Sequence, residues 1–152
     1  MTAPVPRPAG VSTPATAPYW EAAAQGQLQI QKCRQCGKVQ HYPRTLCSSC
    51  WSEDLQLIDA VGTGTVFTYT VVHQPGHPAW REQVPYVLAL IELDEGPRVM
   101  SNIVGVPVDQ ITVGAPVHLT PAPTTDGGPP TVVFTLTDTA TATPATPPES
   151  RV

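Results

Sequence analysis

The chain has 152 residues, a charged fraction of 13% and a formal net charge of −4. Its eight Lys and Arg against twelve Asp and Glu argue against a polybasic nucleic-acid-binding protein. No stretch of eighteen apolar residues occurs, so the sequence predicts no transmembrane helix and no membrane partner.

Both ends of the sequence are rich in Pro, Ala and Thr, and the whole chain holds 19 prolines. Residues 1–18 and 139–152 cannot bury enough apolar surface to offset chain entropy. We therefore expect two disordered tails around a folded unit.

A short helix is predicted at the start of that unit. Pro18 stands where a helix can begin, residues 19–25 include strong helix formers, and Gly26 fits the position that ends a helix. Two turns are too few to be stable alone. Tyr19 and Trp20 must therefore pack against this chain's own ribbon or against a partner.

The four cysteines form two pairs, Cys33-Arg-Gln-Cys36 and Cys47-Ser-Ser-Cys50, separated by ten residues. Two such pairs are typical of a tetrahedral Zn²⁺ held by four thiolates, and Gly37 suits the sharp turn after the first pair. The alternative is two disulfides, but a secreted scaffold of this length normally has more cysteines. We predict a structural zinc. The N-terminus also lacks an apolar signal segment, which together with reduced thiols predicts a cytoplasmic protein.

Strands are expected on both sides of the cysteines. Residues 27–31 alternate polar and apolar side chains, which predicts a strand leading into the first pair. We expect a loop over 37–46 and a short strand over 55–58 that closes the ribbon.

The ribbon segment 28–52 is locally basic. It contains four Lys and Arg and no Asp or Glu. Four positive charges and a net −2 for zinc with four thiolates leave about +2. Such a face either contacts phosphate, on coenzyme A or nucleic acid, or merely keeps the module soluble. The candidates for phosphate contact are Arg34, Lys38 and Arg44.

The rest of the folded unit is predicted to be all β. Runs rich in β-branched and aromatic residues alternate with Gly and Pro turns. Five strands with a central hairpin and no convincing helix favour an OB-fold barrel over a sandwich. The predicted strands cover residues 65–72, 85–93, 98–104, 117–119 and 131–137. The chain thus divides into a helix plus zinc ribbon over 19–60 and an OB-fold domain over 61–138.

The loop between the first two barrel strands holds the remaining candidate binding residues, since loops on barrels carry function. Trp80 and Arg81 form an anchor-type pair for a partner. Alternatively, this loop caps the barrel and its tryptophan covers the open end. His73 and His77 join the partner-binding candidates, and the sequence places no carboxylate beside them for acid–base work.

The series of motifs in this chain resembles the zinc-ribbon/OB-fold family once labelled domain of unknown function 35, the acyl-CoA-associated OB-fold proteins. The resemblance covers nearly all of residues 19–138 and implies a rubredoxin-like ribbon followed by an OB barrel. Its motifs are Trp20-Glu21, Leu28 to Cys33, Cys36-Gly37, Pro43-Arg44, Cys47 to Cys50, Gly62 to Val66, Val71 to His73, Pro85-Tyr86-Val87 and Glu92 to Arg98.

The resemblance also implies a function. Proteins of this family are small subunits that bind a thiolase-like enzyme, in some cases a thiolase-like aldolase, acting on CoA thioesters. The partner carries the chemistry. A two-plus-two heterotetramer, with the acyl-CoA shared between the subunits, is the assembly that the resemblance implies.

The residues themselves favour a subunit without catalytic residues. A thiolase-type reaction needs a cysteine nucleophile, and the metal occupies all four. The sequence has no Gly-x-Ser-x-Gly elbow, phosphate loop or dinucleotide fingerprint. Two alternatives stay open. One is a free-standing acyl-CoA-binding protein. The other, disfavoured by the net charge, is a nucleic-acid-binding protein that stacks bases on Phe67 and Tyr69, which share one predicted strand face.

Overall fold

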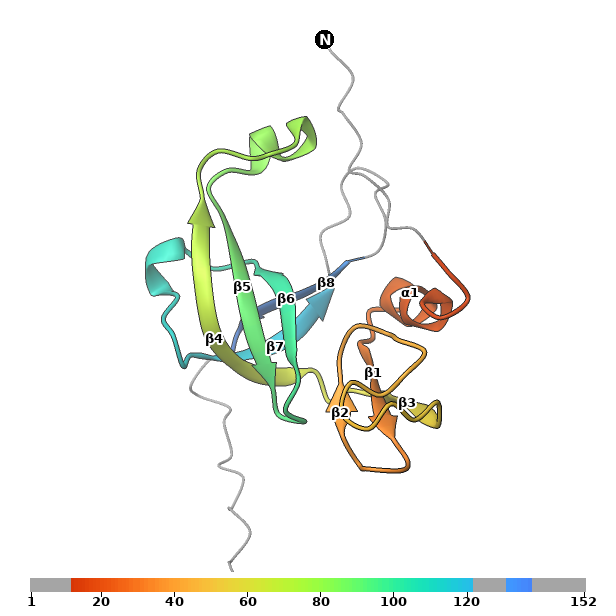
Figure 1. The fold of residues 1–152 in the computed structure, drawn as a ribbon. Helices are drawn as coiled ribbons and strands as arrows, with labels where there is room; N and C mark the ends of the chain where they lie inside the picture. The colour runs from red at the N-terminus through yellow and green to blue at the C-terminus, as the bar shows by residue number, and fades with distance from the viewer. Residues whose placement is uncertain (1–11, 122–130, 138–152) are drawn as a thin grey trace, which may run out of the picture.

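The computed structural model describes residues 12–121 and 131–137. Within them the chain forms a helix, a three-stranded sheet and a closed five-stranded barrel (Figure 1). This confirms the predicted fold class of a short helix and a ribbon followed by an OB-type barrel. Residues 1–11 and 139–152 of the predicted tails lie outside the described residues, while residues 12–16 make a turn before the helix.

Helix α1 spans Ala17–Ala24 and begins one residue before Pro18, the predicted start. Pro18 lies in its first turn, where a missing backbone N–H costs nothing. Gly26 has a φ of +74° and ends the helix as expected. The helix contacts β1 and buries Ala22 and Ala23, so packing on the ribbon stabilises an element too short to fold alone.

The ribbon sheet consists of β1 (Gln29–Cys33), β2 (Val39–Gln40) and β3 (Leu55–Asp59) in the order β2-β1-β3, all antiparallel. Strands β1 and β3 match the predicted ones. The prediction of an uninterrupted loop over 37–46 is wrong, because β2 lies inside it and pairs with β1. Two residues are too few to produce an alternating pattern in the sequence.

The barrel strands follow the predicted order along the chain. Strand β4 pairs with β5 along its length and with β7 at its start, which closes the barrel in the order β4-β5-β6-β8-β7. Two 3₁₀ helices connect the strands. The prediction of no helix missed them, because one or two 3₁₀ turns leave no periodic signal in the sequence. The elements are β4 (Thr63–Val72), η1 (Pro78–Gln83), β5 (Tyr86–Leu93), β6 (Arg98–Ile103), η2 (Val108–Gln110), β7 (Pro116–Pro121) and β8 (Val132–Leu136).

A β-bulge in β4 separates the two aromatic residues that the sequence places on one face. Val66 pairs with Ile91 and Thr68 with Leu90, so Phe67 has no opposite residue. The extra residue shifts the alternation of side chains. Phe67 is 42% exposed, whereas Tyr69 packs against the core. The predicted shared face of Phe67 and Tyr69 is therefore wrong, and with it the base-stacking pair.

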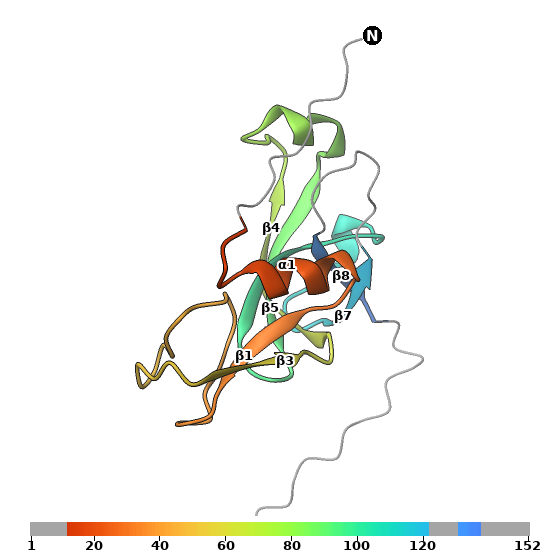
Figure 2. The ribbon, with the colours of Figure 1, turned by 90° about the vertical axis from the view of Figure 1, so that its right-hand side faces the viewer.

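The core is continuous between ribbon and barrel. The inward residues of β5 alternate with its outward residues, and Phe134 of β8 is fully buried. Leu28 and Ile30, beside and within β1, belong to the same cluster of buried side chains as these barrel residues. The backbone N–H of Ala60 also donates to the carbonyl of Leu28 at 2.8 Å. Figure 2 shows that the β4–β5 loop projects from the end of the barrel away from the ribbon.

Candidate functional site

The four cysteine sulfurs converge on one point. All four Sγ atoms lie within 4.8 Å of one another, and Cys33–Cys50 and Cys36–Cys47 are each 3.6 Å apart. A ZnS₄ tetrahedron with bonds of about 2.3 Å has sulfurs about 3.8 Å apart, whereas a disulfide bond is about 2.05 Å long. The cysteines are free thiols in a geometry that fits tetrahedral zinc and not two disulfides.

The pKa values of Cys47 and Cys50 are also consistent with a site that binds a metal cation. Backbone N–H groups of Cys50 and Ser49 lower the pKa of Cys47 to about 6. The backbone N–H of Ser52 likewise favours the thiolate of Cys50, but burial and the other three sulfurs outweigh it and raise the pKa of Cys50 to about 12. Four crowded sulfurs therefore do not all ionise unaided. A zinc held by this set would supply the compensating charge and cross-link the two cysteine pairs, without an open position for substrate.

The two knuckles, Cys33 to Lys38 and Cys47 to Ser52, repeat one backbone pattern. The N–H of Gly37 donates to the carbonyl of Cys33 at 2.9 Å, and the N–H of Trp51 donates to that of Cys47 at 3.1 Å. Gly37 has a φ of +73° and Trp51, in the matching position, a φ of +64°. The sequence analysis missed Trp51, although aligning the two Cys-x-x-Cys pairs would have revealed a tryptophan opposite a glycine.

Two buried glutamines hold the loop before the second knuckle. Gln31 donates from Nε2 to the Arg44 carbonyl at 2.9 Å and accepts from the Arg44 N–H at 3.0 Å. Gln40 donates to Gln31 Oε1 at 2.9 Å and accepts from the Ser48 N–H at 2.8 Å. Sequence alternation placed Gln31 on a solvent face, yet it is 7% exposed. These side chains supply the hydrogen bonds that a longer β2 would otherwise provide.

The predicted phosphate-contacting residues are exposed and differ in their partners. Arg34 forms an ion pair with Asp54 at 3.6 Å. In the part of the chain that the structure describes, no ion pair involves Lys38 or Arg44. Lys38 and Arg44 are therefore accessible to an anion from solvent. Contact of the three residues with coenzyme A stays a prediction.

An aromatic cluster joins α1 to the ribbon. Tyr19 lies 5.2 Å from Trp20 and 5.8 Å from His41, whose ring is 4.5 Å from that of Tyr42. These contacts favour packing of Tyr19 and Trp20 on their own ribbon, and a partner contact there stays a prediction. Burial raises the pKa of Tyr19. The Trp20 Nε1 and His41 Nδ1 atoms are buried without a hydrogen-bond partner.

We expect the buried His41 to make stability depend on pH. Burial lowers its pKa from 6.5 to about 4. Unfolded His41 therefore binds a proton in a window where folded His41 does not, so stability is full above pH 6.5 and falls as the pH drops toward 4. His41→Phe should remove up to about 3 kcal/mol of this loss, measured by urea unfolding across that window with zinc present. Parallel pH profiles for the two proteins would contradict the assignment.

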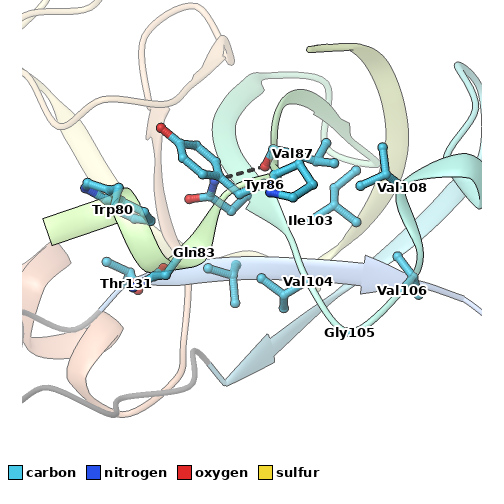
Figure 3. A pocket seen from close by; sticks show the side chains of 13 residues that line it. Trp80, Gln83, Tyr86, Val87, Ile103, Val104, Gly105, Val106, Val108 and Thr131 are labelled. Atoms are coloured by element: carbon cyan, nitrogen blue, oxygen red, sulfur yellow. Dashed lines mark hydrogen bonds between the residues drawn. The ribbon is translucent and has the colours of Figure 1, made fainter. Parts of the chain in front are cut away.

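The β4–β5 loop forms a structured cap with an adjoining cavity. The N–H of Ala79 donates to His77 Nδ1 at 3.2 Å, which caps η1. The half-buried Trp80 ring lies 5.2 Å from Tyr86. Both residues line a mainly apolar cavity of about 250 Å³. Figure 3 shows the side chains around it. His73 and Arg81 are exposed, so their partner-binding role stays a prediction. The cavity was not predicted, because its other lining residues come from distant strands and loops.

Two further observations concern a histidine of the barrel sheet and membrane-spanning helices. His118 of β7 contacts Thr137 Oγ1 through Nδ1 at 3.2 Å, as a residue satisfied within the sheet would. Among the described residues, no helix has the length and hydropathy needed to cross a bilayer.

Comparisons with protein families match both parts of the chain. Residues 20–56 match the ChsH2 rubredoxin-like zinc ribbon domain, and residues 58–120 match the ChsH2 C-terminal OB-fold domain.

The chain is similar to two curated relatives of different lengths. It is 46% identical over 101 residues to a probable enoyl-CoA hydratase alpha subunit of Thermomonospora curvata, covering 66% of this chain and 31% of the relative. It is 36% identical over 93 residues to a DUF35 domain-containing scaffold protein of Methanothermobacter thermautotrophicus, covering 60% of this chain and 69% of the relative. The chain thus spans about a third of the hydratase subunit.

A solved structure supports the same relationship. The chain superposes on a component of the Ltp2-ChsH2(DUF35) aldolase with a TM-score of 0.73 and 40% sequence identity, covering 86% of this chain and 98% of the other. The family models and the solved structure therefore both place a zinc ribbon before an OB-fold domain, as in this chain. The chain belongs to the DUF35 family of ChsH2-type proteins, in which a rubredoxin-like zinc ribbon precedes an OB-fold domain.

Proposed function

We propose that this chain is an accessory subunit that binds and supports a thiolase-superfamily enzyme, a thiolase, acyltransferase or retro-aldolase, acting on acyl-CoA thioesters. The observation that carries the proposal is the 40% identity to a component of an aldolase complex over 98% of that component. The family resemblance of the motifs supports the thiolase-like class of the partner. A two-plus-two assembly is part of the proposal.

The chemistry of the described residues supports an accessory role. Acyl transfer of the thiolase type needs an ionised thiol with an open approach for the thioester. Here every cysteine belongs to one four-sulfur site, where a bound zinc would have no vacant position. The chain would therefore contribute surface and shape, and the partner the nucleophile.

A second candidate, in which this chain itself holds acyl-CoA, is favoured by the cavity beneath Trp80. A cavity of about 250 Å³ with a mainly apolar lining accommodates a ring or short acyl chain. Exposed Lys38 and Arg44 suit phosphates, but they belong to the ribbon, which lies away from the β4–β5 loop (Figure 1). One coenzyme A molecule would have to span this separation to contact both the cavity and the ribbon cations.

Co-expression with candidate thiolase-fold enzymes of the organism that supplies this chain tests the proposal. We expect the two proteins to co-purify and the isolated chain to show no turnover of CoA thioesters. Turnover by the lone chain at the rate of the complex would refute the accessory role.

Trp80→Ala tests whether the β4–β5 loop takes part in the complex. We expect a weakening of about tenfold in affinity, because tryptophan is over-represented among the residues that carry most of the binding energy of protein interfaces. Trp80→Phe, which keeps a ring against Tyr86, is the matched control. The measurement is calorimetric titration with the partner alongside thermal melting. A large fall in melting temperature with unchanged affinity would make Trp80 a cap of the barrel only.

A further inference from the structure

The second knuckle holds a tryptophan in a backbone conformation that favours glycine. Trp51 has a φ of +64°, and its counterpart Gly37 in the first knuckle has a φ of +73°. For a residue with a bulky side chain, this left-handed conformation brings Cβ close to the backbone carbonyl, whereas glycine adopts it freely. The fold therefore uses the favourable residue in one knuckle and an unfavourable one in the other.

Packing within the chain does not compensate for this strain. The Trp51 residue is 76% exposed. Among the described residues, the aromatic contacts involve other side chains and leave the Trp51 indole without a stacked neighbour. A large aromatic residue in a strained conformation, without a contact that explains it, points to a role outside the isolated fold.

The backbone on both sides of the Trp51 side chain is held by hydrogen bonds. The N–H of Trp51 donates to the Cys47 carbonyl at 3.1 Å, and the N–H of Cys47 donates to the Ser52 carbonyl at 2.9 Å. The same knuckle supplies two of the four converging sulfurs. Because this backbone is already ordered, only the side-chain torsions of Trp51 would lose freedom when the indole binds.

The charges beside Trp51 indicate what kind of partner it meets. Glu53 and Asp54 follow within three residues and are both exposed, and Asp54 is paired with Arg34. Residues 45–54 contain no Lys or Arg, and Arg34 is engaged by Asp54, so no cation of this knuckle is placed to hold the phosphates of a nucleotide stacked on Trp51. An apolar pocket on a folded protein is the surface that suits this indole.

We propose that Trp51 is an anchor through which the zinc ribbon binds its enzyme partner, with the indole buried in an apolar pocket of that partner. The proposal rests on the proposed function for the identity of the partner as a thiolase-fold enzyme. It adds the ribbon knuckle as an attachment point, on a different part of the chain from the β4–β5 loop.

The test is Trp51→Gly in the full-length chain, because glycine suits the backbone and removes only the side chain. Relief of strain offsets the greater flexibility of unfolded glycine, so we expect an unchanged zinc content and a melting temperature equal to or above that of the parent. The Kd for the thiolase-fold partner, measured by calorimetric titration, should rise at least about tenfold. Trp51→Phe should restore part of the affinity. Val113→Ala, at a residue that is 65% exposed on the barrel, is the control and should change neither quantity.

The outcomes separate this inference from the proposed function. If the parent chain does not bind the enzyme, the proposed function is refuted, and so is the proposal that Trp51 binds this enzyme. If the parent binds and Trp51→Gly binds equally well, only the anchor role is overturned. A variant that loses zinc or melts well below the parent would place Trp51 among the residues that hold the knuckle, and would also overturn the anchor role.

Discussion

Cys36→Ser is expected to abolish zinc binding and to unfold the ribbon. Cys36 is exposed, so the substitution removes little packing, and its effect must come from the metal. Its Sγ lies 3.6 Å from that of Cys47 and completes the four-sulfur site. In small zinc domains the metal contributes about 10–16 kcal/mol to folding, which exceeds the stability of an ordinary domain. Zinc analysis of the purified protein, with circular dichroism melting, measures both effects.

Ser49→Ala is the matched control for this prediction. Ser49 is an exposed residue of the second knuckle, and the hydrogen bond that it makes to Cys47 Sγ uses its backbone N–H, which alanine retains. The control should bind one zinc per chain and melt with the parent. Full zinc content and unchanged melting in Cys36→Ser would refute a structural metal in this site.

Gly64→Ala is expected to destabilise the barrel by about 3 kcal/mol. Gly64 is buried in β4, opposite Leu93 of β5 and Val117 of β7, where the barrel closes. A Cβ built on Gly64 would lie 2.3 Å from the carbonyl oxygen of Glu92, a backbone atom that no side-chain rotation can move away. The strands would have to separate at the closure. Urea unfolding of the zinc-loaded protein measures the loss.

Gly76→Ala provides the comparison, because its Cβ would meet nothing within 4 Å and its φ is not positive. We expect a change of less than about 0.5 kcal/mol there. Equal stabilities for Gly64→Ala and Gly76→Ala would mean that β4 and β5 are farther apart in solution than the structure places them.

The elements that the sequence predicted correctly are those whose signal is local. Paired cysteines, glycines at turns and runs rich in β-branched and aromatic residues each depend on a few neighbouring residues, so the ribbon and the barrel strands were predictable. Gly37 is an example, since the residue type alone indicates the positive φ that it adopts.

The features that were missed depend on contacts between distant residues. Gln31 is buried because Arg44 and Gln40 satisfy its amide, and nothing in the alternation of β1 signals this. The bulge at Phe67 depends on how β5 pairs with β4. Of the candidate site, the sequence identified the four cysteines that converge, whereas the partner-binding role of the Trp80 loop stays a prediction. The cavity and the conformation of Trp51 required the folded chain.

The shared core has a consequence for how these proteins evolve and how they can be engineered. Leu28 and Ile30 of the ribbon are buried in the same hydrophobic core as the barrel residues. If the ribbon were replaced by that of another family member, its core side chains would not match those of this barrel. Cavities or steric clashes would then arise where the ribbon packs against the barrel. The two halves are therefore expected to be inherited together, and a functional chimera would need its joint redesigned on both sides.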